Sequence, residues 1–259
     1  MVVKDVKFVN NKVKVICDGT DFLISKENYI ENPITIDSQI TEEKISKLLE
    51  YEFVIENKLQ MIKLLNKKAL SEYEVYKWLK EKNVSPVYIK QIIDSLKSIG
   101  LINDEYVAII TLERELFKRK GKKEIKNVLK EKRIDEAIIA RVVNEIDEDL
   151  YKENFNKVVS KYLKMYDKKS GKVKNNLLRQ KLEEMGYEYE LISSLDLGVD
   201  NSRELDLAKN SLVKIIKNKN MDLNSYENIN KIKLKLANKG FSYDIINMAL
   251  EEVKKNETY

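Results

Sequence analysis

A run of basic residues near the middle of the chain is the feature best suited to binding chemistry. Residues 118–123 read Lys-Arg-Lys-Gly-Lys-Lys, and the stretch 112–133 carries ten basic and four acidic residues. That stretch has a net charge of +6 and the whole chain has +5, so the rest of the chain sums to about neutral. We expect such a local positive potential to attract phosphate groups or an acidic protein surface. The alternative is an ordinary solvated surface in a lysine-rich chain.

The spacing of the lysines beyond residue 121 places them together on one predicted helix. Lys122, Lys126 and Lys130 follow one another at steps of four residues, so they share one helix face, opposite the apolar residues. Gly121 lies beside the start of this helix, where free backbone N–H groups would add positive potential. The candidate contacts of the basic segment are therefore Lys118, Arg119, Lys120, Lys122, Lys123, Lys126 and Lys130.

Two further groups of side chains are secondary candidates. Lys67 and Lys68 precede a predicted helix start and would extend a basic surface, although the helix dipole also favours lysines at a helix C-terminus. Tyr73, Tyr76 and Trp78 suggest stacking on nucleic-acid bases. Aromatic residues at helical spacing more often lie in a core, and we favour the core for these three.

The composition excludes most catalytic chemistry. The chain has no His and a single Cys, so it cannot build a His-dependent triad, a Cys/His zinc cluster or an internal disulfide. The sequence also lacks a glycine-rich phosphate loop, a carboxylate pair in a recognisable spacing and a nucleophile motif. We therefore expect a non-enzymatic protein with no catalytic residues, no metal site and no cofactor. Cys17 is expected to be a small core residue rather than a reactive thiol.

The same sequence features bear on location. The N-terminus lacks the basic start and apolar run of a signal peptide, and no stretch approaches ~18 consecutive apolar residues. A single Cys suits a reducing compartment. These features predict a soluble, cytoplasmic protein that makes no membrane contact, and a monomer is the expected state.

An internal repeat predicts the elements that position the basic segment. Four leucines, spaced by 50, 53 and 54 residues, begin similar motifs: Leu79, Leu129, Leu182 and Leu236. In each motif a turn residue follows four positions later, then an apolar residue, then a capping or acidic residue. Each copy therefore predicts a helix end, a tight turn and a new helix start. A period of ~50 residues built from such motifs indicates an array of helical repeats.

The turn residues of the four motifs are Asn83, Arg133, Gly186 and Gly240. All four are predicted to enter the left-handed region of backbone conformation. Glycine enters that region without steric penalty and asparagine tolerates it. Arg133 has neither property, so we expect backbone strain there.

Local signals mark further helix boundaries. Ser71 and Glu74 form a predicted capping box, in which each side chain bonds the other's backbone N–H. Ser85-Pro86 and Asn103 mark the starts of the next helices. Breaks within the second and third repeats are expected at Gly121 and at Ser170-Gly171.

Residues 1–30 differ from the rest of the chain. Short β-prone runs separated by Asn10-Asn11 and Asp18-Gly19 predict three strands in a small antiparallel sheet. Thr41 is predicted to open a short helix, and the first repeat would begin with a separate helix near 51–67. The expected fold is all-α, with four tandem three-helix units in a curved array and a small β extension at the N-terminus. The expected domains are 1–48, 49–100, 101–147, 148–200 and 201–259.

Several of these residues occur together in a recognisable pattern. Residues 69–71 read Ala-Leu-Ser before Glu74, and residues 100–108 read Gly-Leu-Ile-Asn-Asp-Glu-Tyr-Val-Ala. Arg114, Lys120-Gly121-Lys122, Ile125 and Leu129-Lys130-Glu131-Lys132 with Ile134 follow. In order and spacing these residues resemble the RecX family of recombinase regulators, and the match is most specific over about 59–146. The predicted N-terminal sheet resembles that of the long form of this family. Asn103, Arg133 and Lys68 depart from the usual Asp, Gly and Arg of that family.

The resemblance implies a protein that binds the RecA–DNA filament, most often as an inhibitor of filament assembly or ATP turnover, with some affinity for DNA. By carry-over onto matching positions, it implies that Arg114, Lys120, Lys122 and Lys123 make contacts. Two alternatives stay open. One is a sequence-nonspecific DNA-binding helical-repeat protein whose ligand is the phosphate backbone, and the other is a helical adaptor for an unrelated protein.

Overall fold

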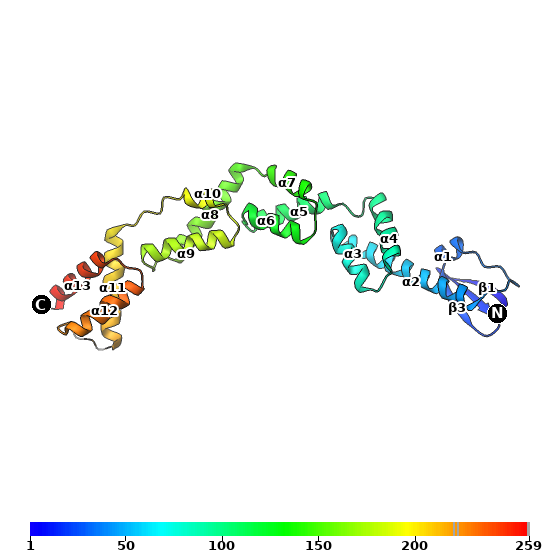
Figure 1. Cartoon of the computed structure of the whole chain (residues 1–259), viewed down its shortest axis with the longest axis horizontal. Coiled ribbons are helices and arrows are strands. Elements are labelled where there is room, and N and C mark those ends of the chain that lie inside the picture. Colours follow the sequence, from blue (N-terminus) through cyan, green and yellow to red (C-terminus); the bar gives the residue numbers. More distant parts are fainter. Residues whose placement is uncertain (220, 222, 258–259) are drawn as a thin grey trace. The chain divides into compact units, whose positions relative to one another are not determined.

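The computed structural model describes residues 1–219, 221 and 223–257. Figure 1 labels the helices and strands of the chain. The chain forms two compact units: the first comprises Met1–Ile110 and Lys130–Ile138, and the second comprises Thr111–Leu129 and the residues from Ile139 onward.

The N-terminal residues form the three-stranded antiparallel sheet that the sequence predicts. Strands β1 (Val3–Val9), β2 (Lys12–Cys17) and β3 (Asp21–Ser25) lie in the order β1-β2-β3. Alternate residues of β2 point into the core, and Val13, Val15 and Cys17 are buried there, as the two-residue period of a strand requires. Burial raises the pKa of the Cys17 thiol above its ordinary value. The expectation of a small core cysteine is confirmed.

The helix that follows the sheet is longer than predicted. After the short helix α1 (Lys26–Glu31), which the sequence did not predict, α2 runs without interruption from Glu42 to Leu65. The expectation of a short helix at Thr41 and a separate one near 51–67 is therefore wrong. No Gly or Pro interrupts this stretch, and α2 contributes to two cores: Ile45 and Leu48 pack under the sheet, while Val54, Met61 and Leu65 pack among the first helices.

A buried carboxylate fixes the start of α1 to the middle of α2. Glu52 accepts hydrogen bonds from the backbone N–H of Ser25 at 2.6 Å and from the side-chain amide of Asn28 at 3.3 Å. The ammonium of Lys12 lies 3.5 Å from the other carboxylate oxygen. Because a buried charge is tolerated only with such partners, this cluster explains why one helix serves both the sheet and the first repeat.

The rest of the chain is helical, and the helices fall into the predicted groups of three. In chain order the groups are α2–α4, α5–α7, α8–α10 and α11–α13. The bounds of the helices after α2 are α3 (Glu72–Glu81), α4 (Pro86–Ser98), α5 (Asp104–Phe117), α6 (Lys122–Glu131), α7 (Glu136–Asn144), α8 (Glu148–Met165), α9 (Gly171–Glu184), α10 (Tyr189–Ser193), α11 (Asn201–Lys219), α12 (Tyr226–Asn238) and α13 (Tyr243–Glu257). The all-α class with a small N-terminal sheet is confirmed. The domain boundaries stay a prediction.

The four repeated turns share one backbone geometry. Asn83, Arg133, Gly186 and Gly240 have φ angles of 61°, 55°, 83° and 88°. Each donates its N–H to the carbonyl three residues earlier, at 2.8–2.9 Å. In three of the turns the next N–H also bonds the carbonyl of the anchoring leucine, as in Val84 to Leu79 at 3.2 Å. This is the Schellman motif that ends a helix with a left-handed residue.

Arg133 is the strained member of this set, as the sequence predicts. An L-residue in the left-handed region costs roughly 1–2 kcal/mol, and Arg133 adopts a φ of 55°. Its guanidinium lies over the ring of Tyr73, 5.6 Å from the centroid. A cation–π contact of this kind contributes about 0.5–1 kcal/mol at an exposed site, so it offsets part of the strain.

The predicted helix starts are also present. Ser71 and Glu74 form a complete capping box, and Asn103 accepts from the backbone N–H of Tyr106 at 3.0 Å. Pro86 occupies the first turn of α4, although the Ser85 side chain makes no capping hydrogen bond. These local signals therefore placed the helix boundaries correctly.

Candidate basic binding site

The basic segment, residues 118–123, connects α5 to α6 through a further left-handed turn. Arg119 has a φ of 57°. Its N–H donates to Leu116 at 2.8 Å, and the N–H of Lys120 donates to Glu115 at 3.0 Å. The geometry is that of another Schellman motif. The sequence does not predict this turn, because no Gly or Asn marks the position.

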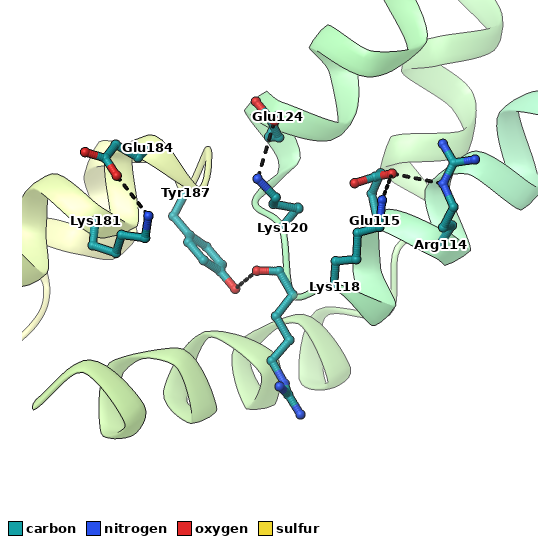
Figure 2. Close-up of polar contacts among 9 residues, drawn as sticks. Arg114, Glu115, Lys118, Lys120, Glu124, Lys181, Glu184 and Tyr187 are labelled. Atoms are coloured by element: carbon teal, nitrogen blue, oxygen red, sulfur yellow. Dashed lines mark hydrogen bonds and ion pairs between the residues drawn. The ribbon is translucent and has the colours of Figure 1, made fainter. Parts of the chain in front are cut away.

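The turn between α9 and α10 holds the basic segment in place. The N–H of Gly121 donates to the carbonyl of Met185 at 2.7 Å, and the N–H of Lys123 donates to Gly186 at 3.0 Å. The hydroxyl of Tyr187 donates to the carbonyl of Arg119 at 2.9 Å (Figure 2). A Cβ on Gly121 would lie 2.2 Å from the backbone of Gly186. Gly121 therefore allows an approach that no other residue permits.

We call the second helix of each group of three its middle helix. Equivalent contacts occur at the starts of two other middle helices, α3 and α9, each of which begins against a turn of the next repeat. There the N-cap residue is serine, and its hydroxyl donates to the next turn: Ser71 to the carbonyl of Lys132 at 2.9 Å, and Ser170 to that of Lys239 at 2.7 Å. Gly121 takes the same position but donates its backbone N–H. We call this recurring contact the repeat junction.

A second hydrogen bond completes each repeat junction. The first N–H of the middle helix donates to a side chain from the first helix of the next repeat: Glu72 to Asp104, Lys122 to Tyr151 and Gly171 to Glu204, at 2.8, 2.9 and 2.8 Å. The Tyr151 hydroxyl in turn donates to Glu188 at 2.6 Å. Burial, followed by the bond to Glu188, raises the pKa of Tyr151, so this hydroxyl stays protonated.

These bonds correct one expectation for the basic segment. The backbone N–H groups of Gly121, Lys122 and Lys123 were expected to be free at the helix start and to attract anions. In the structure they donate to Met185, Tyr151 and Gly186, respectively. The positive potential of the segment therefore comes from its side chains.

A buried carboxylate organises two of the predicted cations. The side chain of Glu115 is 6% exposed, and one of its oxygens lies 3.0 Å from Arg114 and 2.9 Å from Lys118 (Figure 2). Burial alone would raise the pKa of Glu115, but the hydrogen bonds from Lys118 and Arg114 outweigh it and hold that pKa below its usual value. The structure thus brings Arg114 and Lys118 together around one carboxylate, whose negative charge offsets one of their two positive charges.

Other predicted cations are also paired. Lys120 lies 3.5 Å from Glu124, and Lys122 contacts both Glu148 and the ring of Tyr151. Lys130, which belongs to the first compact unit, lies 2.9 Å from Glu136. Half-buried Lys122 thus does not share a solvated face with Lys126 and Lys130 in the way that its spacing predicted.

Three cations of the region remain available for a ligand. Arg119, Lys123 and Lys126 are exposed and make no ion pair with any residue that the structure describes. Lys67 and Lys68 lie exposed in the turn after α2, in the first compact unit. The site therefore presents one exposed cation, Arg119, on a loop held by hydrogen bonds, and two, Lys123 and Lys126, on the helix that follows it.

The preference for a core position was wrong for two of the three aromatic residues on α3. Tyr73 and Tyr76 are 39% and 37% exposed, while Trp78 packs against the first helical core. The contact of Tyr73 with Arg133 explains its outward position, because the turn that carries Arg133 covers one face of the ring.

Residues 1–219, 221 and 223–257 hold neither a candidate metal site nor a candidate membrane span. That part of the chain contains no cluster of three or more Cys, Asp or Glu side chains able to bind a metal ion. It also contains no helix of the length and apolar character needed to cross a membrane.

The chain is similar to proteins of known family over most of its length. No family model matches it. It is 30% identical over 220 residues to "Regulatory protein RecX" of Listeria welshimeri, covering 82% of this chain and 81% of that protein. It is 28% identical over 243 residues to the protein of the same name from Lactococcus lactis subsp. cremoris, covering 91% and 90%.

Two solved structures share the fold. One is "Crystal structure of regulatory protein RecX", with a TM-score of 0.64 and 18% identity over 74% of this chain and 97% of that one. The other, of RecX from Lactobacillus salivarius, has a TM-score of 0.51 and 25% identity over 56% and 94%. From the shared sequence and fold, we conclude that this chain belongs to the RecX family of regulatory proteins.

Proposed function

We propose that this chain regulates the RecA recombinase by binding the RecA–DNA filament. In this proposal it inhibits filament assembly, ATP hydrolysis and strand exchange, and so acts in homologous recombination and DNA repair. It does so without catalysis of its own, as a cytoplasmic monomer. The similarity to regulatory RecX proteins supports a regulatory role.

The observation that carries the proposal is the fixed basic segment. Four hydrogen bonds hold its backbone: its N–H groups donate to Met185, Gly186 and Tyr151, and its Arg119 carbonyl accepts from Tyr187. Since little conformational entropy is then lost on binding, exposed cations on this segment and on the α6 helix that it starts bind an acidic surface more tightly than cations on a mobile segment. We assign the contacts with the filament to Arg119, Lys123 and Lys126, with Arg114 and Lys118 beside them.

The test is RecA-dependent ATP hydrolysis on single-stranded DNA, titrated with the whole chain. We expect hydrolysis to fall when the chain is present at far fewer copies than RecA. A charge-reversal variant with Arg119→Glu, Lys123→Glu and Lys126→Glu should lose this effect while keeping the helical circular dichroism of the wild type.

A matched control uses Lys44→Glu, Lys63→Glu and Lys90→Glu, which change the net charge equally at exposed positions of α2 and α4. This control should inhibit as the wild type does. Equal loss in both variants would mean that net charge alone matters, and the assignment of the basic segment would be wrong.

A second candidate function is sequence-nonspecific DNA binding. The exposed cations without carboxylate partners favour it. In that case hydrolysis would fall only when the chain covers all the DNA, and the effect would weaken steeply with added salt because phosphate contacts release counterions.

A further inference from the structure

A second basic surface lies in the third group of helices. Residues 157–181 contain nine basic residues and one acidic residue, a net charge of +8. This exceeds the +6 of residues 112–133. The near-neutral sum of the rest of the chain conceals it, because acidic stretches elsewhere compensate for it. We call residues 157–181, with Lys239, the α8–α9 surface.

Most charges of this surface have no ion-pair partner among the residues that the structure describes. Of its nine basic residues in 157–181, only Lys157 and Lys181 form ion pairs with residues that the structure describes, with Glu153 and Glu184. The one acidic residue, Asp167, is paired with Arg203. By contrast, most of the cations in 112–133 have carboxylate partners. The α8–α9 surface therefore carries the larger unscreened positive charge.

Helical geometry gathers these cations. Lys157, Lys161 and Lys164 are spaced by four and three residues on α8 and line one shallow depression along it. Beyond the end of α8, Lys168, Lys169 and Lys239 line a hollow of about 290 Å³. Because one water occupies roughly 30 Å³ in the liquid, this hollow has room for a phosphate group and its first waters.

Two tyrosines lie among the cations. The rings of Tyr162 and Tyr166 are 5.8 Å apart at an interplanar angle of 31°. The ammonium groups of Lys161 on α8 and Lys181 on α9 lie 5.5 and 5.9 Å from the ring centroid of Tyr162. Both tyrosines are half-buried. Aromatic faces beside lysines are the arrangement by which proteins hold unstacked bases next to their phosphates.

We propose that the α8–α9 surface binds single-stranded nucleic acid, with phosphates at Lys161, Lys164, Lys168 and Lys169 and bases against Tyr162 and Tyr166. The proposal does not rest on the proposed regulation of RecA, because it concerns a different surface and its test contains no RecA. Duplex DNA would use the lysines but not the tyrosines, since its bases are stacked on one another.

The experiment is fluorescence anisotropy of a labelled oligothymidylate with the whole chain, at about 50 and 200 mM salt. The variant Lys164→Gln, Lys168→Gln, Lys169→Gln should bind more weakly. The slope of log affinity against log salt should become shallower by roughly 0.7 for each lost phosphate contact, or about 2 for three contacts. The variant Lys44→Gln, Lys63→Gln, Lys90→Gln has the same net charge and should keep the wild-type slope.

A second variant tests the tyrosines. Tyr162→Leu keeps an apolar side chain on α8 but removes the aromatic face, and it should weaken oligothymidylate binding by on the order of tenfold. Binding of an abasic oligonucleotide or of a duplex should not change. An equal loss for all three probes would overturn the stacking part of the proposal.

A measurement on the wild-type chain avoids any effect of substitution on folding. Amine-reactive labelling read by mass spectrometry should show protection of Lys161, Lys164, Lys168 and Lys169 by oligothymidylate, with Lys63 and Lys90 unprotected. The proposal is overturned if these four lysines label equally with and without DNA, or if both triple variants lose the same salt dependence.

Discussion

Gly121→Ala is the substitution that most directly tests the repeat junction. The new Cβ would lie 2.2 Å from the carbonyl carbon and oxygen of Gly186, and those are backbone atoms that a side-chain rotation cannot move. The φ of Gly121 is not in the left-handed region, so alanine adds no backbone strain of its own. The whole effect must come from separation of the basic segment and the α9–α10 turn.

The magnitude follows from the bonds that separation would break. The hydrogen bonds from Gly121 to Met185, from Lys123 to Gly186 and from Tyr187 to Arg119 all cross this contact. At about 1 kcal/mol net for each, their loss amounts to about 3 kcal/mol. Since every 1.4 kcal/mol is a factor of ten, amide exchange in this region should accelerate by on the order of a hundredfold.

The assay is hydrogen–deuterium exchange by mass spectrometry on peptides that cover 115–125 and 182–190. Gly198→Ala is the matched control, because a Cβ there would have as its nearest neighbour a side-chain oxygen of Asp196 at 3.9 Å. We expect wild-type exchange in the control. If Gly121→Ala exchanged as slowly as the wild type in both peptides, the close approach at Gly121 would be refuted.

Three further predictions concern the other repeat junctions. In urea titrations, Ser71→Ala should lower the free energy of unfolding by about 2 kcal/mol and Ser170→Ala by about 1 kcal/mol. The Ser71 variant loses a helix cap as well as the hydrogen bond to the next turn, whereas the Ser170 variant loses only that hydrogen bond. Equal losses in the two variants would contradict this. Bonds from Lys132 and Ser71 outweigh burial and lower the pKa of Glu74 from 4.5, so its stabilising effect is present above pH 4.5 and is lost as pH falls through the lower folded-state value. Lys132→Met should flatten this acid dependence, and an unchanged pH profile would count against it. Burial raises the pKa of Asp104, so a charged carboxylate is unfavourable there. Asp104→Asn keeps an acceptor oxygen and should unfold at no lower urea concentration than the wild type. Asp104→Ala has no acceptor for the N–H of Glu72 and should unfold at a lower urea concentration.

Local rules were sufficient to predict the turns and helix starts from the sequence. A leucine followed by a left-handed residue four positions later describes a Schellman motif completely, because all its bonds lie within six residues. The same holds for the capping box at Ser71 and Glu74. Arg119 shows the limit of these rules, since its left-handed conformation has no compositional signal. Its carbonyl also accepts a hydrogen bond from Tyr187, 68 residues further along the chain.

The state of the charges could not be predicted in the same way. The pairs Lys118–Glu115 and Lys120–Glu124 have i,i+3 and i,i+4 spacing, so the sequence alone could suggest them. Glu148, by contrast, becomes the partner of Lys122 only because α8 packs beside the start of α6. The charge of the α8–α9 surface could have been counted from the sequence. Its significance depends on the absence of ion pairs among the described residues, which only the structure supplies.

At each repeat junction, the residue before a middle helix donates a hydrogen bond to the turn of the next repeat. The donor is a serine hydroxyl at two junctions and a backbone N–H at the third, which contains the basic segment. A serine hydroxyl keeps the backbones of Ser71 and Ser170 one side chain away from the next turn. At Gly121 the backbone itself makes the contact, and Tyr187 adds a bond to the carbonyl of Arg119. Direct backbone bonds have fewer rotatable bonds between them than side-chain bonds, so this junction allows less motion. We therefore expect the basic segment to be held more rigidly against the α9–α10 turn than Ser71 and Ser170 are held against the turns that they contact.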